Sequence, residues 1–176
     1  MKAFFTLLVA LLAVVGGVYA LNYFVLGKPM HEIITGDSRN ASIELSTHYD
    51  NYINPISLVI NVQAIGDSST PADVFRILLQ YASQLKDTHF ERVLLQAKGT
   101  DKFTLKGEYF QTLGNEYGTQ NPVYTMRTFP EHVYKLDGSP AFETWSGGML
   151  SVLGKQMEDF ATFNQQWYIN DLITAN

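Results

Sequence analysis

Residues Ala3–Leu26 form a nearly unbroken apolar run directly behind Lys2, and no other feature constrains the fold as strongly. The run has no charged side chain, and its only clearly polar residues are Thr6 and Asn22. A helix of about 20 apolar residues is long enough to cross the hydrocarbon core of a bilayer. The run therefore predicts a membrane-spanning helix that carries the rest of the chain on one side of the membrane.

The same segment also fits a cleaved secretory signal. Lys2 supplies a short positive region, Ala3–Val15 an apolar region, and Val18–Ala20 a small-residue motif for cleavage. Cleavage after Ala20 would leave Leu21–Leu26 as an apolar tail, and the run is longer than the apolar part of an ordinary signal. We therefore favour a retained anchor and keep the signal peptide as the alternative.

The flanks of the run predict where the helix ends and how it is oriented. Gly27–Pro29 combines a helix breaker with a positive charge, so we expect the helix to stop there, with Met30–Asn40 as a polar connector. The positive charge at Lys2 favours a cytoplasmic N-terminus. We thus expect residues 1–28 to be the anchor and residues 29–176 to be a single extracytoplasmic domain, or a periplasmic one after cleavage.

Composition excludes several classes of protein. Apolar residues make up 46% of the chain and aromatic residues 13%, which is typical of a folded domain rather than a disordered stalk. The net charge of −5 argues against a nucleic-acid partner, which would favour a basic surface. The chain has no Cys, which excludes disulfides, Cys-ligated metals and lipid attachment through Cys.

Hydrophobic periodicity predicts strands that alternate with helices. Ile56–Ile65 is the clearest strand, and Thr70, Pro71 and Asp73 give a good helix start. The predicted strands are Ile43–Leu45, Ile56–Ile65, Arg92–Ala97, Phe103–Leu105 and Val123–Phe129, and the predicted helices are Pro71–Lys86, Glu108–Tyr117 and Met149–Trp167. These elements indicate an α/β or α+β domain in which helices cover a mixed sheet of about four to five strands.

The last predicted helix carries a long apolar stripe. Its members are Met149, Leu153, Met157, Phe160, Phe163 and Trp167. A stripe at helical spacing normally faces the core, so we expect these side chains to be buried. Tyr117 and Tyr168 lie off the main stripes and are the better candidates for an exposed interface.

The segment from Asn121 to Gly148 is the densest in residues that bind ligands or partners. Its candidate site residues are Tyr124, Arg127, His132, Tyr134, Trp145, Gly147 and Gly148. A Gly pair before a helix offers backbone N–H groups to an anion, and Arg127 would add a charged fork. Exposed aromatic residues with an Arg are equally typical of protein interfaces.

Catalytic signatures are missing from the sequence. It contains no G-x-S-x-G, P-loop or H-E-x-x-H motif, and its four His residues have no ligand spacing, so we expect no metal and no cofactor. The leading hypothesis is a non-enzymatic accessory domain that binds a protein partner in an envelope complex. The alternative is a small periplasmic ligand-binding protein or hydrolase, which a pocket containing Arg127, His132 and Asp137 would favour.

Overall fold

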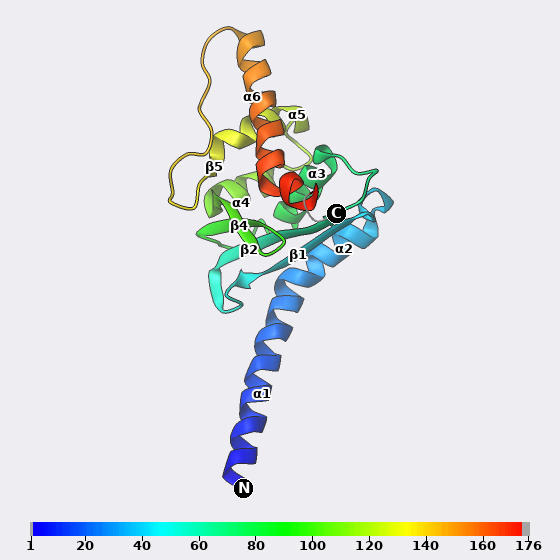
Figure 1. The fold of residues 1–176 in the computed structure, drawn as a ribbon, viewed down its shortest axis with the longest axis vertical. Coiled ribbons are helices and arrows are strands. Elements are labelled where there is room, and N and C mark those ends of the chain that lie inside the picture. The colour runs from blue at the N-terminus through cyan, green and yellow to red at the C-terminus, as the bar shows by residue number, and fades with distance from the viewer. Residues whose placement is uncertain (1, 174–176) are drawn as a thin grey trace.

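The computed structural model describes residues 2–173 and shows an α+β domain on a long N-terminal helix (Figure 1). Its sheet has the order β1-β2-β3-β4-β5, and all neighbouring pairs are antiparallel except β2 and β3, which are parallel. The strands are β1 (Ile43–Asp50), β2 (Asn54–Ile65), β3 (Arg92–Ala97), β4 (Thr100–Lys106) and β5 (Val133–Tyr134). The predicted mixed sheet with covering helices is confirmed.

The helices lie mainly on one face of this sheet. They are α1 (Lys2–Asn22), α2 (Lys28–Gly36), α3 (Pro71–Gln84), α4 (Gly107–Glu116), α5 (Pro122–Thr128), α6 (Met149–Asn164) and α7 (Asn170–Ile173). Alternate β2 residues Leu58, Ile60 and Val62 share one core with Val74 and Leu78 of α3. This helix links the parallel strands β2 and β3, as expected for a crossover connection.

Helix α3 begins where the sequence predicted. Asp73 accepts hydrogen bonds from the Thr70 backbone N–H (2.8 Å) and from the Thr70 hydroxyl (2.7 Å), while Pro71 occupies the first turn. These contacts use donors that the start of a helix would otherwise leave without partners. They also lower the pKa of Asp73 below its usual value.

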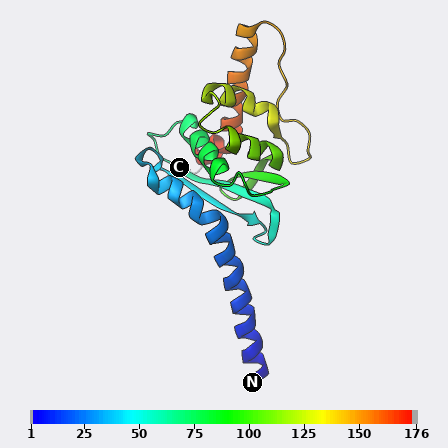
Figure 2. The same cartoon turned by 180° about the vertical axis from the view of Figure 1, so that it is seen from behind.

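The predicted helix end at Gly27–Pro29 is wrong. Tyr23–Gly27 forms a π-helical turn, η1, in which the Lys28 N–H donates to the Tyr23 carbonyl, and the chain continues directly into α2. The wider turn accommodates Pro29, which has no N–H to give to the helix. The predicted connector Met30–Asn40 is therefore largely helical, and Figure 2 shows the bend from α1 into α2.

The apolar part of this continuous helix stands clear of the domain. Within the described residues, the helix from Lys2 to Gly36 contains a window with a mean hydropathy of 2.4, long and apolar enough to cross a membrane. None of that window is buried inside the protein. The N-terminal helix is thus compatible with a membrane anchor or with a signal sequence.

The end of the apolar run belongs to the core of the domain. Leu26 and Met30 are completely or almost completely buried. The Leu26 carbonyl accepts hydrogen bonds from the Thr47 hydroxyl (3.0 Å) and the Tyr81 hydroxyl (3.1 Å). Burial at this site raises the pKa of Tyr81. The helix is therefore joined to β1 and α3 by packing and by buried hydrogen bonds.

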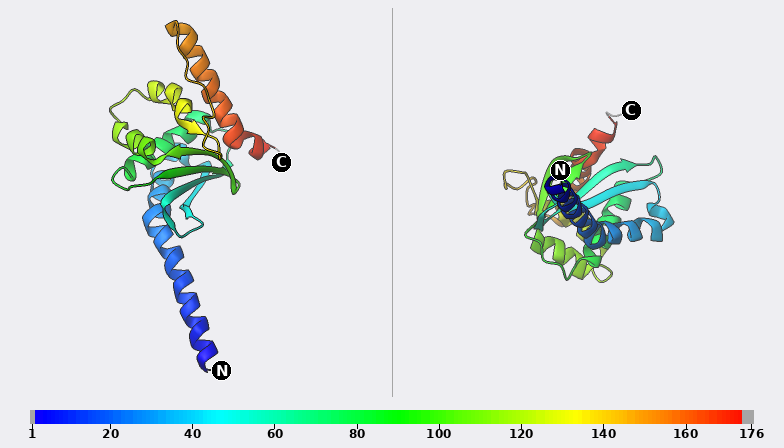
Figure 3. Two further views of the ribbon diagram at one scale, coloured as in Figure 1. Left: turned by 90° about the vertical axis from the view of Figure 1, so that its left-hand side faces the viewer. Right: turned by 90° about the horizontal axis from the view of Figure 1, so that it is seen from below.

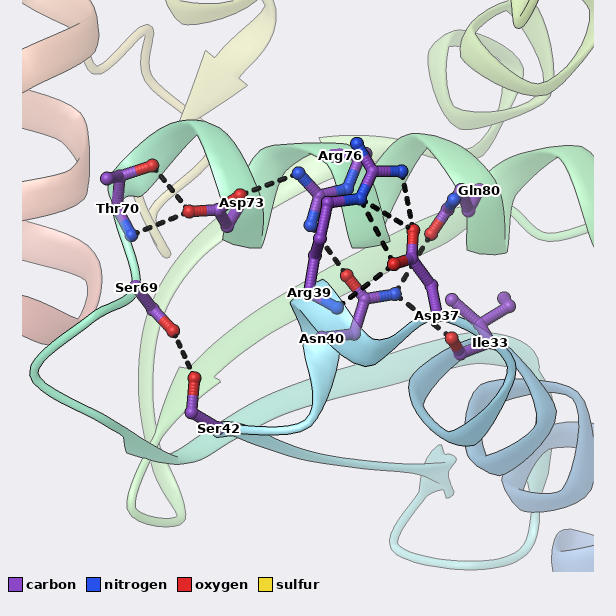
Figure 4. Close-up of polar contacts among 10 residues, drawn as sticks. All are labelled: Ile33, Asp37, Arg39, Asn40, Ser42, Ser69, Thr70, Asp73, Arg76 and Gln80. Carbon is purple, nitrogen blue, oxygen red and sulfur yellow. Dashed lines mark hydrogen bonds and ion pairs between the residues drawn. The ribbon is translucent and has the colours of Figure 1, made fainter.

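A polar network ties the loop after α2 to α3 (Figure 4). Buried Asn40 donates to the Ile33 carbonyl (3.0 Å) and accepts from Arg76 Nη2 (2.7 Å), while Arg76 Nη1 donates to Asp73 (2.6 Å). Asp37 accepts from Arg39 through both carboxylate oxygens, which lowers the pKa of Asp37 to about 2. This network fixes the angle between α2 and α3.

The predicted strand Val123–Phe129 is wrong, because most of this segment is the helix α5. The Asn121 side chain accepts from the Val123 N–H (2.9 Å), and Pro122 occupies the first turn. These start signals for a helix outweigh the β-propensity of the residues that follow. The fifth strand is instead the short β5, whose Val133 pairs with Leu105 of β4.

Helix α6 divides the predicted apolar stripe into two halves. Phe160, Phe163 and Trp167 are buried, as predicted. Met149 is 81% exposed, and Leu153 and Met157 are also exposed, so the prediction is wrong for the first half. Figure 1 shows that the start of α6 extends past the body of the domain, which leaves Met149 at its tip exposed.

Tyr168 is buried and is not the exposed residue that we predicted. The helix continues after α6 through a π-helical turn, η4 (Gln165–Ile169), which shifts the helical phase by about one residue. Both Trp167 and Tyr168 then face the core, and the Tyr168 hydroxyl donates to Asn164 (2.9 Å). Periodicity that assumes a regular α-helix cannot anticipate this shift.

Candidate functional site

The distal end of the molecule, opposite the N-terminus, contains the first half of α6, the loop 135–148 and the nearby helix α5 (Figure 3). The candidate residues lie along the chain that leads from α5 to the start of α6. A 3-10 turn, η3 (Phe129–His132), connects α5 to β5. The distal end thus combines two helices and a long loop on a support of buried aromatic side chains.

Arg127 joins α5 to α6. Its Nη1 donates to Gln156 Oε1 (2.6 Å), and Gln156 in turn donates to Glu131 (2.6 Å). The Arg127 guanidinium also lies over the Tyr124 ring, 4.8 Å from its centroid. Gln156 is buried and Arg127 is half-buried, so this chain of contacts holds the two helices together.

Trp145 connects the long loop to the side of α6. Its indole N–H donates to Asp159 (2.6 Å), and the Lys155 ammonium lies 5.5 Å from its ring centroid. Lys155 also pairs with Glu158 at 3.1 Å. Trp145 is half-buried, and the open hollow beside it has a volume of about 800 Å³. The lining of this hollow includes Lys135, Phe142 and Asp159, but neither Arg127 nor His132.

His132 and Tyr134 face other partners. The His132 ring stacks on Tyr109 of α4 with 3.9 Å between ring centroids. Partial burial lowers the pKa of His132, and Lys106 lowers it further, while Glu131 opposes the change. The Tyr134 ring lies 5.1 Å from the Lys106 ammonium. These two residues therefore contact α4 and β4, away from Arg127 and Trp145.

The two glycines form the entry to α6. Gly147 has a φ of +130°, in the region that favours glycine, and Gly148 is the residue before the helix. The Val152 N–H donates to the Gly148 carbonyl (3.0 Å), which starts the helix in the usual way. The pair thus lets the loop turn into the exposed end of α6.

In the part of the chain that the structure describes, the candidate residues contact separate neighbours. Arg127 contacts Gln156, His132 contacts Tyr109, and Asp137 accepts from the Ser139 backbone N–H and hydroxyl. The Ser139 contacts lower the pKa of Asp137. Among residues 2–173 there is no group of three or more His, Cys, Asp or Glu side chains that would hold a metal ion.

The distal end instead presents an apolar stripe that sequence reasoning assigned to the core. We define the distal stripe as Met149, Leu150, Leu153 and Met157, all on one face of α6. Met149 and Leu150 are each 81% exposed. Gly154 lies between these residues with open space above it, so another backbone has room to approach closely. Periodicity identified the stripe but not which half of it lacks a partner.

A second hollow lies between α3 and the segment that runs from the end of α4 into α5. Its volume is about 540 Å³, and its lining includes Phe75, Leu79, Leu113, Tyr117 and Met126. Tyr117, which we predicted to be an exposed interface residue, is 41% exposed at this groove. The groove is more apolar than the hollow beside Trp145, but it contains no set of groups for catalysis.

Comparisons with protein-family models, curated proteins and solved structures gave no match to this chain.

Proposed function

We propose that this chain is a single-pass membrane protein whose domain binds another protein through the distal stripe. The exposure of Met149 and Leu150, at the end opposite the apolar helix, is the observation that carries this proposal. Contiguous apolar side chains on a soluble surface are typical of protein-binding sites. Methionine is common on such surfaces because its flexible side chain adapts to different partners.

The surroundings of the stripe also support protein binding. Tyr124 is exposed beside Arg127 on α5, and Arg127 donates to Gln156 of α6, so an aromatic and an Arg side chain lie next to the helix that carries the stripe. This mixture is typical of interfaces that exclude water at their centre. The distal stripe is short, straight and on a helix, which fits recognition by a groove or by a second helix.

Retention of α1 as the anchor is part of this proposal. The cleavage motif Val18–Ala20 lies inside a continuous helix, and the Tyr19 ring packs against Tyr52 at 5.2 Å. Asn22 and Leu26, farther along the run, are buried in the domain. The helix therefore fits an anchor that is built into the domain. The Lys2 charge supports a cytoplasmic N-terminus and an extracytoplasmic domain that would be an accessory subunit of an envelope complex.

Site-specific photocrosslinking in native membranes tests the proposed binding surface. A benzophenone amino acid replaces Met149 in the full chain, and a matched control carries it at Ser151, about 160° away around the helix. We expect one discrete crosslinked protein from position 149, none from 151, and loss of the product when Leu150→Lys is added. Equal products at both positions, or a product that survives Leu150→Lys, would reject the distal stripe as the binding surface.

A further inference from the structure

The hairpin between β1 and β2 carries exposed apolar residues at its tip. The chain turns at Asn51 and Tyr52, which have φ values of +51° and +65°, as tight hairpin turns require. Ile53 is 71% exposed, and Tyr52 and Ile56 are exposed as well. We define the hairpin tip as Tyr52, Ile53 and Ile56.

The buried side chain of Asn22 joins the hairpin to α1. Asn22 donates to the Tyr52 carbonyl (2.8 Å) and accepts from the Tyr49 N–H (2.7 Å). Tyr52 is stacked on His48 at 4.4 Å and also contacts the Tyr19 ring of α1. These contacts fix the hairpin tip at a defined height along the helix.

An apolar groove of about 490 Å³ separates the hairpin from the helix. Its lining comes from both sides and consists of Val14, Gly17, Val18 and Leu21 of α1 and Tyr49, Tyr52, Ile53 and Pro55 of the hairpin. Tyr52 and Ile53 of the hairpin tip therefore lie beside the stretch Val14–Leu21, well inside the apolar run.

The length of the helix then determines the depth of the tip. The stretch from Ala3 to Val14 has about 12 residues and spans about 18 Å, too short for a hydrocarbon core of about 30 Å. About 20 residues, Ala3–Asn22, are needed to reach 30 Å. A spanning α1 must therefore place Val14–Leu21, and the hairpin beside it, within the half of the bilayer nearer the domain.

We propose that the hairpin tip inserts into the lipid of that leaflet next to α1, an inference that depends on the proposed retention of α1. Backbone groups of the turn have hydrogen-bond partners. The Tyr52 N–H donates to the Tyr49 carbonyl (2.7 Å), and the Tyr52 carbonyl accepts from the Asn22 side chain. Pairing of this kind reduces the free-energy cost of placing a turn in lipid. Tyr52 suits the headgroup layer through its amphipathic ring. The nearest ion pair, Asp50 with Arg92 at 2.8 Å, lies where β1 ends just before the turn, and its Arg92 side chain is half exposed, so we expect this pair to mark the outer limit of insertion.

The absence of Cys from the chain makes a direct depth measurement possible. Single Cys replacements at Ile53, Ile56, Leu12 and Leu136 carry nitroxide spin labels in the full chain, reconstituted in vesicles of phosphatidylcholine and phosphatidylglycerol. Collision with oxygen, which concentrates in lipid, is compared with collision with a water-soluble nickel complex. Leu12 is the reference within α1, and Leu136 is the exposed control on the loop 135–148.

We expect labels at 53 and 56 to favour oxygen, with a depth between the labels at 12 and 136. Labels at 53 and 56 that match 136, while 12 is deep, would overturn the inference and leave the anchor intact. Two results would overturn the inference and the anchor together. One is a label at position 12 that collides more with the nickel complex than with oxygen, and the other is a mature chain that starts at Leu21.

Discussion

The two ends of this molecule both expose apolar side chains, but their surroundings differ. At the end that carries α1, Ile53 lies beside an apolar helix long enough to span a bilayer, and this position is the reason for proposing lipid contact there. At the distal end, Met149 and Leu150 extend past the domain, and no neighbouring segment accounts for theirs. Similar exposure therefore supports two different proposals, lipid contact beside α1 and protein contact at the distal end.

The two ends also differ in how they are held. Asn22 fixes the hairpin by hydrogen bonds to the backbone of Tyr49 and Tyr52. In the part of the chain that the structure describes, the exposed end of α6 is held along its polar side, through Gln156 and, farther along, through Asp159 with Trp145. The hairpin is thus joined to the domain by buried hydrogen bonds, whereas Met149 and Leu150 of the distal stripe contribute little packing.

The largest expected effect is the contrast between the two halves of α6. Phe163→Ala should lower the free energy of unfolding by about 3–5 kcal/mol, because Phe163 is completely buried among other aromatic rings. Met149→Ala should change it by less than about 0.5 kcal/mol. Denaturant unfolding of both variants in the same detergent measures the difference. A large loss for Met149→Ala would mean that the distal stripe packs within the folded protein.

An intermediate effect is expected at the joint between helix and hairpin. Asn22→Ala should cost about 1–3 kcal/mol, because the buried Tyr49 N–H then has no partner. Tyr23 is the next residue and is exposed, so Tyr23→Ala serves as the control and should have little effect on stability. Thermal unfolding in detergent measures both. Equal stabilities of the two variants would show that the hairpin does not depend on α1.

The smallest effect concerns pH. Burial lowers the pKa of His132, so the unfolded chain binds more protons than the folded chain between that lowered pKa and the unfolded value of about 6.5. Stability should therefore fall as the pH drops through this window. His132→Phe keeps a ring against Tyr109 without a titrating group and should flatten the dependence. Denaturant midpoints measured across this pH window give the pH dependence of stability. If the midpoint changes equally with pH in the wild-type protein and in His132→Phe, His132 is not the cause.

Much of the fold was predictable because its signals are local. Apolar residues alternate along the sequence of β2, and α3 has both a capped start and an amphipathic stripe, so each could be recognised from a short window. The errors at Gly27–Pro29 and at Tyr168 have one cause: a π-helical turn widens the helix and changes its phase. A rule based on 3.6 residues per turn has no means of placing such a turn.

The candidate site was less predictable because exposure depends on the whole fold. In the sequence, the stripe from Met149 to Trp167 looks like one uniform apolar face. It consists of an exposed part and a buried part because α6 is longer than the body of the domain that it packs on. Arg127 and Trp145 were recognised as unusual, but their partners Gln156 and Asp159 lie on a helix far along the chain. Such pairings arise from tertiary packing, which periodicity does not encode.

The helix continues without a break from α1 through η1 into α2, so α1 joins the domain directly and not through a loop. If α1 is held in a bilayer, a rotation about its axis should turn the domain as well, since the helix is continuous from Lys2 to Gly36. One residue inserted into α1 would turn the domain by about 100° and move it by about 1.5 Å. The direction that the distal stripe faces is thus set by the phase of a helix at the opposite end of the molecule.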